Sequence, residues 1–522
     1  MNIQKATVLI VLAIASFTGA VALAQAVPLF RFIEQPGPHP VGLRVLEQYD
    51  YSRTFRSDVD ALGKPFTGER ARPLQTLVWY PAQKTSGRPM TVGDYGNLLA
   101  TETSFDKPNM SSDWKEWIRA MTPTVKDPMW AVRDAPVVSG HYPVVIYAPS
   151  FGAMAWENAD LCEYLASHGY VVIASPDMGS INREMTSDLT GVNTQARDIS
   201  FLIGYAKTLP DTDTSKIAVV GFSWGGISNL FAAARDNRIS ALVALDGSMR
   251  YFPGLVKQAG DVHPDQMTIP LLFFTQGEIS LENIERNHSS PNQLGPSVLN
   301  AWTHGDLITV HDLALTHTEH SSMYQRNEDV WKEYPQVRKG DYVREDGITG
   351  YAWICRYTLF FLDAYLKGDP AALSSLKKTP AQNGVPNHFM TVDFRPATGR
   401  PTTLRALQIE TGQQGFDHVR DIYTAMKKQA PDFKPEESSL HSWAISLSDE
   451  SHLSEAISVL KLEVHIYPDS GDAYDDLGQV YLLAGQKQLS IESYKKSLEK
   501  DPSNEDAKQK LSELGVIKPV IN

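Results

Sequence analysis

Cysteine is nearly absent from this sequence, since only Cys162 and Cys355 occur. A chain of this length with so few cysteines does not depend on a disulfide framework, and the sequence leaves open whether these two pair. Basic charge is also in deficit, because 61 acidic residues outweigh 48 Lys and Arg residues and leave a net charge of −13. That balance argues against nucleic acid or an anionic membrane surface as a partner.

Long apolar runs are missing from residue 27 onward, so the sequence predicts no integral membrane segment there. The first residues differ, because Lys5 is followed by the apolar stretch 6–24 and the small-residue pattern Ala24-Gln25-Ala26. A basic start, an apolar centre and such a pattern are typical of a secretory signal peptide. We therefore predict a signal peptide over residues 1–26 and an exported protein, periplasmic or secreted. An uncleaved membrane anchor is the alternative.

Short apolar runs alternate with amphipathic ones over the first two thirds of the chain. Strands are predicted at residues 41–51, 74–80, 143–148, 170–174, 217–220, 239–245, 269–275 and 307–311. Helices are predicted at residues 155–168, 193–209, 227–235 and 351–367. This alternation predicts the α/β class, with a doubly wound, mostly parallel sheet covered on both faces. Residues 99–134 break the rhythm and are expected to form a helical insertion, either a flap over the site or an ordinary surface helix.

The run Gly221-Phe222-Ser223-Trp224-Gly225 lies between a predicted buried strand and a predicted helix. Strand, G-x-S-x-G and helix in that order are typical of a nucleophile elbow. Small residues are needed two positions to either side of Ser223, because larger side chains collide in so sharp a turn. We therefore expect Ser223 to be a nucleophile; a tight turn with an incidental serine is the alternative.

A nucleophilic serine needs a histidine base and a carboxylate that orients the base. Two carboxylates follow predicted strands after the serine, namely Asp246 and Glu278. The base is expected after the last predicted strand, in a region that contains His311, His317 and His320. We favour His320, in the loop after that strand, with His317 as the alternative base. No H-x-x-x-H or H-E-x-x-H spacing occurs there, so no metal site is predicted.

These segments together resemble the serine α/β-hydrolase family that includes platelet-activating-factor acetylhydrolases and, more distantly, dienelactone hydrolases. The resemblance covers about residues 40–375 and is carried by residues 77–82, 143–152, 164–172, 221–226, 244–246 and 360–368. It implies Asp246, which ends an Ala-Leu-Asp strand, as the triad acid, and leaves Glu278 as the alternative acid. It also favours His320, because the family histidine precedes a short polar pair and an apolar residue, here Met323.

The resemblance also implies an oxyanion hole, formed by the backbone N–H of Trp224 and a second N–H after the strand 143–148. Family members have His-Gly-x-Gly at the second place, whereas this chain has Pro-Ser-Phe-Gly at residues 149–152. Phe151 is then the expected donor, since any residue other than proline supplies an N–H. No cofactor is implied.

The last part of the chain has a different pattern, with a period of 34 residues typical of tetratricopeptide repeats. We predict a hydrolase domain over residues 27–382, a linker over 383–401 and a helical domain over 402–522. The helical domain is expected to contain repeats at residues 437–470 and 471–504 and a cap helix at 505–514.

Two repeats are fewer than the three or so that usually stand alone. The helical domain is therefore expected to dock on the hydrolase domain, through helices near Phe416 and Tyr423, or to pair with a second chain. Its groove is predicted to bind a peptide or a partner protein.

The sequence as a whole predicts an exported serine hydrolase of carboxylic esters, with short-acyl or phospholipid-like esters favoured by the resemblance. One alternative is an acyltransferase or peptidase that uses the same triad. The other is a partner-binding repeat protein whose hydrolase domain is inactive.

Overall fold

The computed structural model describes residues 29–60, 62–106, 108–276, 297–333 and 342–517 of the chain. The predicted signal peptide lies outside these residues, so export stays a prediction. No helix in the described ranges has both the length and the apolar character needed to cross a bilayer.

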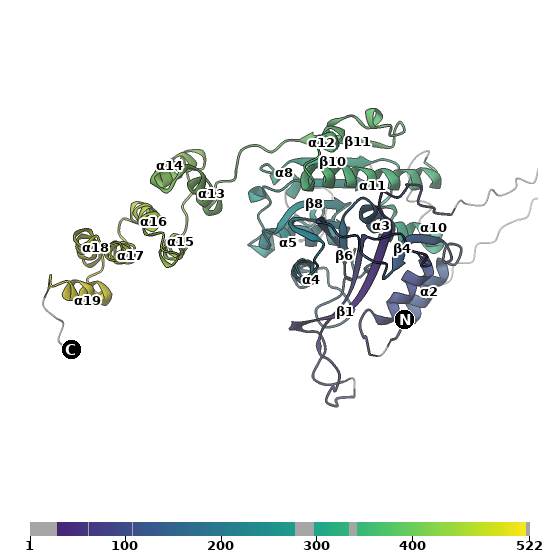
Figure 1. Ribbon diagram of the computed structural model, residues 1–522, viewed down its shortest axis with the longest axis horizontal. Coiled ribbons are helices and arrows are strands. Elements are labelled where there is room, and N and C mark those ends of the chain that lie inside the picture. The colour runs from purple at the N-terminus through teal and green to yellow at the C-terminus, as the bar shows by residue number, and fades with distance from the viewer. Residues whose placement is uncertain (1–28, 61, 107, 277–296, 334–341, 518–522) are drawn as a thin grey trace, which may run out of the picture.

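Among the described residues, eleven strands form one mixed sheet in the order β11-β10-β9-β8-β7-β5-β6-β2-β1-β4-β3 (Figure 1). The strands are β1 (Val41–Thr54), β2 (Ala71–Pro81), β3 (Pro89–Thr91), β4 (Pro128–Arg133), β5 (Tyr142–Ala148), β6 (Val171–Ala174), β7 (Thr212–Phe222), β8 (Ile239–Leu245), β9 (Leu271–Gln276), β10 (Leu307–Asp312) and β11 (Met390–Arg395). The six neighbours from β6 to β10 run parallel, while β2 against β6, β1 against β2, β3 against β4 and β11 against β10 are antiparallel. Parallel strands bring their carboxyl ends to one edge, so the residues that follow β5, β7, β8 and β10 meet there.

Helices cover both faces of the sheet, as predicted. They are α1 (Val92–Asn97), α2 (Ser112–Ala120), α3 (Ala159–Ser167), α4 (Leu189–Ala206), α5 (Trp224–Arg235), α6 (Pro253–Ala259), α8 (Val298–Ala301), α9 (Ser322–Arg326), α10 (Glu328–Glu333), α11 (Arg344–Leu366) and α12 (Pro370–Lys377). Alternate residues of β5 point to opposite faces: Val145 and Tyr147 pack with α3 and α11, whereas Val144 and Ile146 pack with α4 and α5. This period of two buries both faces of the central strands.

The predicted linker, residues 383–401, contains part of the sheet. β11 pairs with β10 along its whole length, from Arg395 opposite Leu307 to Met390 opposite Asp312. The side chains of Val392 and Phe394 pack against the core beneath it. A short edge strand bounded by Gly, Pro and Asn gives a weak sequence signal. The linker prediction is therefore wrong for this stretch, and the sheet domain extends past residue 382.

Residues 99–134, expected to be a helical insertion, are only partly helical. α2 is the helix, while β4 joins the sheet in parallel with β1. Met129 and Ala131 of β4 are buried in the core. β4 is a strand because it pairs with β1, which is far away in the sequence. The local sequence pattern does not reveal such pairing.

Helices make up the region that follows β11. They are α13 (Leu404–Gln414), α14 (Val419–Gln429), α15 (Glu437–Asp449), α16 (Leu453–Ile466), α17 (Gly471–Leu483), α18 (Lys487–Lys500) and α19 (Glu505–Glu513). The pairs α15–α16 and α17–α18 coincide with the predicted repeats, and α19 coincides with the predicted cap. The assignment to tetratricopeptide repeats stays a prediction.

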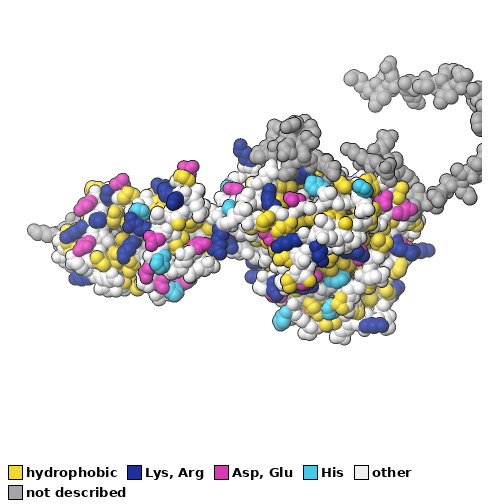
Figure 2. Space-filling model, turned by 90° about the horizontal axis from the view of Figure 1, so that it is seen from above, with side chains coloured by type: hydrophobic (Ala, Val, Ile, Leu, Met, Phe, Trp, Pro, Cys, Tyr) yellow, Lys and Arg dark blue, Asp and Glu magenta, His cyan; other side chains and the backbone are white. Residues whose placement is uncertain are grey.

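The aromatic residues expected to dock this region on the hydrolase domain pack within it instead. The ring of Phe416 lies 5.9 Å from Trp443, and that of Tyr423 lies 5.8 Å from Phe433. Figures 1 and 2 show the helices extending away from the sheet domain beyond a narrow waist. The expected docking through Phe416 and Tyr423 is therefore wrong, because both side chains are used in packing within the helical region. Phe416 packs against α15 and α16, and Tyr423, which belongs to α14, packs among residues of α13, α15 and α16.

Candidate active site

Ser223 lies at the turn between β7 and α5, where the sequence predicted it. Its backbone is strained, with φ at +52°. A Cβ added at Gly221 would lie 2.4 Å from the backbone of Gly225, and one added at Gly225 would lie 2.1 Å from the Ala148 carbonyl oxygen. The turn therefore requires both glycines, and it presents the half-buried serine hydroxyl at the carboxyl edge of the sheet.

His317 lies between Ser223 and Asp246. Its Nε2 is 2.9 Å from Ser223 Oγ, and its Nδ1 is 2.5 Å from Asp246 Oδ2. It begins a 3₁₀ turn (His317–His320) that follows β10. The imidazole is 37 % exposed, so part of the ring is open to solvent. The three side chains form one chain of hydrogen bonds from a hydroxyl to a carboxylate, the arrangement that activates a serine.

Asp246 follows β8 and is fully buried. Its second oxygen, Oδ1, accepts hydrogen bonds from the Tyr251 hydroxyl at 2.9 Å and from the Gln276 N–H at 3.4 Å. Burial by itself raises the pKa of this carboxyl, but the hydrogen bond and charge of His317, with smaller contributions from His320 and Tyr251, outweigh burial and lower it. The group is therefore poised as a carboxylate that orients His317. Glu278, the alternative acid, lies outside the described residues.

The preference for His320 over His317 as the residue next to the serine is wrong. His320 is completely buried, and its Nε2 lies 3.1 Å from Asp312 Oδ2. Its Nδ1 faces the carbonyl oxygens of Thr316 and His317, at 3.0 and 3.2 Å. Although burial lowers the pKa of His320, Asp312 raises it more, so the net direction is upward. His320 thus holds the turn that carries His317, and does not reach Ser223.

The sequence does contain a signal for the turn that carries His317. Thr316 and Glu319 form a capping box, in which the Glu319 carboxylate accepts the Thr316 N–H at 2.8 Å. A T-x-x-E pattern predicts that the turn begins at the next residue. This pattern does not separate the two histidines, because side chains three residues apart in a 3₁₀ turn lie on the same side. The contact of His320 with Asp312 inside the protein leaves His317 as the histidine that faces Ser223.

The two residues expected to supply the oxyanion donors are in contact through their side chains. The rings of Phe151 and Trp224 are 5.6 Å apart, edge to face. The Ser150 N–H is bonded to Glu157, and the Gly152 N–H to Asp177, each at 2.8 Å. Within the described ranges neither the Phe151 N–H nor the Trp224 N–H has an acceptor, so both are available to an oxyanion.

The insertion reaches the same loop. The Arg183 guanidinium lies over the ring of Trp114 in α2, 5.6 Å from its centre, and donates to the Asp177 carbonyl at 2.7 Å. Asp177 in turn accepts the N–H of Gly152, which belongs to the expected oxyanion loop, residues 149–152. α2 therefore lies beside the site, although its action as a flap stays a prediction.

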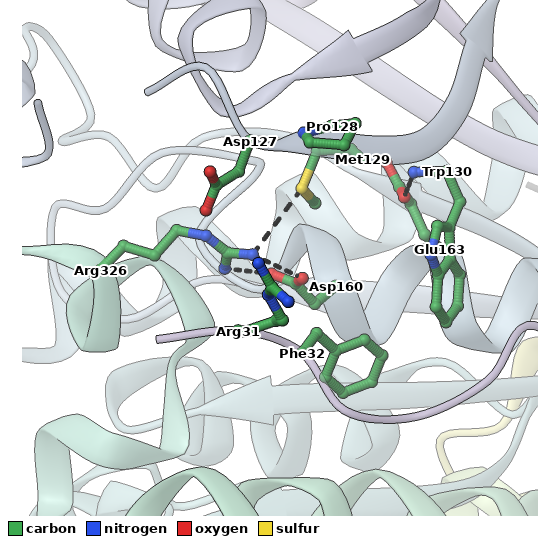
Figure 3. A pocket seen from close by; sticks show the side chains of 9 residues that line it. All are labelled: Arg31, Phe32, Asp127, Pro128, Met129, Trp130, Asp160, Glu163 and Arg326. Atoms are coloured by element: carbon green, nitrogen blue, oxygen red, sulfur yellow. Dashed lines mark hydrogen bonds and ion pairs between the residues drawn. The ribbon is translucent and has the colours of Figure 1, made fainter. Parts of the chain in front are cut away.

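A cavity of about 230 Å³ lies elsewhere, between the N-terminal segment and β4 (Figure 3). Its wall contains the buried pair of Arg326 and Asp160, joined at 2.8 Å, and the carboxyl of Glu163. Arg326 ends α9, the helix that follows the turn with His317. The cavity contains no residue of the triad.

Comparisons with known proteins place this chain beside several ester-cleaving enzymes by name. Residues 100–251 match the chlorophyllase family. A putative carboxymethylenebutenolidase from Yersinia pestis is 28 % identical over 123 residues, which are 21 % of this chain and 45 % of that protein. A ferulic acid esterase structure from Streptomyces cinnamoneus has a TM-score of 0.45 and 17 % identity, and the match covers 70 % of this chain and 98 % of that one.

The sequence matches support an α/β-hydrolase. The family match includes Phe151, Ser223 and Asp246 but ends before His317. The narrower resemblance to platelet-activating-factor acetylhydrolases stays a prediction. The chain matches less than half the length of the Yersinia pestis protein. The activity of that protein is therefore not assigned to this chain, and the function is treated as a proposal.

Proposed function

We propose that this protein is an exported serine hydrolase that cleaves carboxylic esters. The observation that carries the proposal is the hydrogen-bond chain from Ser223 through His317 to Asp246, at 2.9 and 2.5 Å. The names of the matching proteins, a chlorophyllase family and a carboxymethylenebutenolidase, agree with ester chemistry. Export rests on the signal-peptide pattern of residues 1–26.

In the proposed reaction, His317 Nε2 takes the proton of Ser223 as Oγ attacks the ester carbonyl. Asp246 stabilises the imidazolium that forms, and the N–H groups of Phe151 and Trp224 bind the oxyanion. The imidazolium then gives its proton to the departing alcohol, and an acyl-enzyme remains. Water, deprotonated by His317, attacks the acyl group and releases the acid and the free serine. Donors of this kind contribute about 3–4 kcal/mol each in acyl transfer.

The acyl group is proposed to be short, of about two to four carbons, since each CH₂ contributes ~0.8 kcal/mol only where a pocket accommodates it. Trp224 lies between the rings of Phe151 and Phe252, at 5.6 and 5.7 Å. We propose that these rings limit the room for a long acyl chain beside the serine. A panel of p-nitrophenyl esters tests this, and kcat/KM that rises steadily with long chains contradicts it.

Labelling with a fluorophosphonate tests the proposed function directly. The wild type should be labelled at Ser223 and should hydrolyse p-nitrophenyl acetate, while Ser223→Ala should do neither and should keep its melting temperature. Wild-type turnover in Ser223→Ala would falsify the mechanism. Product analysis with an added alcohol or amine separates hydrolysis from acyl transfer.

A further inference from the structure

Two consecutive buried residues, Glu157 and Asn158, lie between the loop of Phe151 and the turn of His317. Neither side chain is exposed to solvent. A buried carboxylate or amide destabilises the fold unless its hydrogen bonds are satisfied, so their partners show what they hold.

Glu157 holds the oxyanion loop. Its Oε2 accepts the Ser150 N–H at 2.8 Å and the Tyr147 hydroxyl at 3.0 Å, and its Oε1 accepts the Ser150 hydroxyl. The Ser150 carbonyl accepts the Ala153 N–H at 2.9 Å. The peptide group between Ser150 and Phe151 is thereby fixed, and the orientation of the Phe151 N–H with it.

The same two residues hold the histidine turn. The Glu157 carbonyl accepts the Ser321 hydroxyl at 2.8 Å and the Met323 N–H at 3.3 Å. The Asn158 amide donates to the His320 carbonyl at 3.1 Å and accepts the Ser322 N–H at 2.9 Å. The turn that carries His317 is thus bonded to the residues that hold the oxyanion loop.

The Tyr147 hydroxyl links the two side chains, because it accepts from Asn158 at 2.8 Å and donates to Glu157. Asn158 Oδ1 also accepts the Tyr351 hydroxyl at 2.9 Å. The Asn158 side chain therefore uses two donors and two acceptor sites, which leaves it a single orientation.

We propose that Glu157 and Asn158 are positioning residues that set the oxyanion donor Phe151 and the base His317 at the spacing a tetrahedral intermediate requires. This inference rests on the proposed function. Donor and base come from segments far apart in the chain, and misplacement by 1 Å costs up to about 100-fold in rate. Nothing in the sequence motifs marks either residue, because neither touches the substrate.

The role of Glu157 is geometric, so a neutral side chain of the same length should hold Ser150 and Tyr147 equally well. Burial raises the pKa of its carboxyl to about 7, and the protonated form can make the same contacts. Glutamine can place its oxygen at the Oε2 position and donate from its amide to the Ser150 hydroxyl. Aspartate keeps the charge but is one methylene shorter, so it cannot reach Ser150 and Tyr147 together.

The test compares Glu157→Gln with Glu157→Asp, using p-nitrophenyl acetate and the full chain. Glu157→Gln should keep kcat within about 3-fold, and Glu157→Asp should lose ~10- to 100-fold in kcat with little change in KM. Glu163→Asp is the matched control. Glu163 is equally buried and accepts the Tyr95 hydroxyl at 2.6 Å and the Trp130 N–H at 2.5 Å, but it faces the cavity of Figure 3. Its shortening should leave kcat unchanged.

Wild-type kcat in Glu157→Asp overturns the proposal. So does an equal loss in Glu157→Gln, which would indicate a role for the charge, or an equal loss in Glu163→Asp, which would indicate general destabilisation. If Glu157→Asp does not fold, Tyr147→Phe decides, because it removes only the hydroxyl that links the two side chains. It should lower kcat by about 3- to 10-fold, because the hydroxyl makes two hydrogen bonds of modest net strength, and an unchanged kcat refutes the inference.

Labelling of the wild type by a fluorophosphonate separates failure of the positioning role from failure of the proposed function. If Ser223 is labelled but Glu157→Asp is not less active than Glu157→Gln and Glu163→Asp, the positioning role fails and the proposed function stands. If the wild type is neither labelled nor active, the proposed function fails, and the positioning role fails with it.

Discussion

Separate alanine substitutions of His317 and His320 give the sharpest test of the site. His317→Ala removes the imidazole 2.9 Å from Ser223 Oγ, and kcat should fall by at least ~10³- to 10⁴-fold. The protein should remain folded, because His317 is partly exposed and Asp246 keeps its hydrogen bonds from Tyr251 and Gln276.

His320→Ala should behave in the opposite way. It leaves Asp312, which is 1 % exposed, without its ionic partner. Removal of one member of a buried pair costs about 3–5 kcal/mol. The entropy of unfolding is roughly 2.1 cal/mol/K per residue, so in a domain this large each kcal/mol lowers the melting temperature by only about 1–2 °C, and a fall of about 5 °C is expected. The folded fraction should keep kcat within about 10-fold, since one lost contact displaces His317 only slightly.

Steady-state turnover of p-nitrophenyl acetate at 25 °C and thermal unfolding followed by circular dichroism measure the two effects separately. Three outcomes would refute the reasoning: turnover retained in His317→Ala, turnover abolished in His320→Ala at an unchanged melting temperature, or equal melting temperatures in both variants.

Three further predictions follow from the structure. Asp246→Asn should lower kcat by about 10⁴-fold because Nδ1 of His317 loses its charged acceptor, whereas Tyr251→Phe should be mild; similar losses in the two variants contradict this assignment. Burial raises the pKa of Glu163 to about 8, so the folded state holds its proton more tightly than the unfolded chain, and stability should fall as pH rises from about 4.5 through 8. Between pH 5 and pH 9 the free energy of unfolding, measured with urea, should fall less for Glu163→Gln than for the wild type. An equal fall in both would show that Glu163 does not cause the pH dependence. A chain that ends at Arg400 should keep small-ester turnover, whereas one that ends at Gly384 lacks β11 and should aggregate through the exposed edge of β10; equal solubility of the two contradicts the role of that strand.

The central part of the fold is predictable from sequence because its signals are local. The buried strands β5 to β10 are short apolar runs, and the elbow at Ser223 is specified by glycines two residues away. The helix pairs of the C-terminal region likewise follow from apolar spacing within each helix. In each case the residues that specify the structure lie within a few positions of it.

The parts that sequence left undecided depend on contacts between distant segments. β4 and β11 are strands because β1 and β10 offer them unpaired edges. His317 reaches Ser223, and His320 does not, because Asp312 and two carbonyls hold His320 inside the protein. Glu157 and Asn158 carry no motif, and their place between two loops appears only when β5 and the turn after β10 meet at one edge of the sheet. Local pattern therefore determined the position of Ser223, the proposed nucleophile, while tertiary packing decided that His317 faces it and what holds the two segments together.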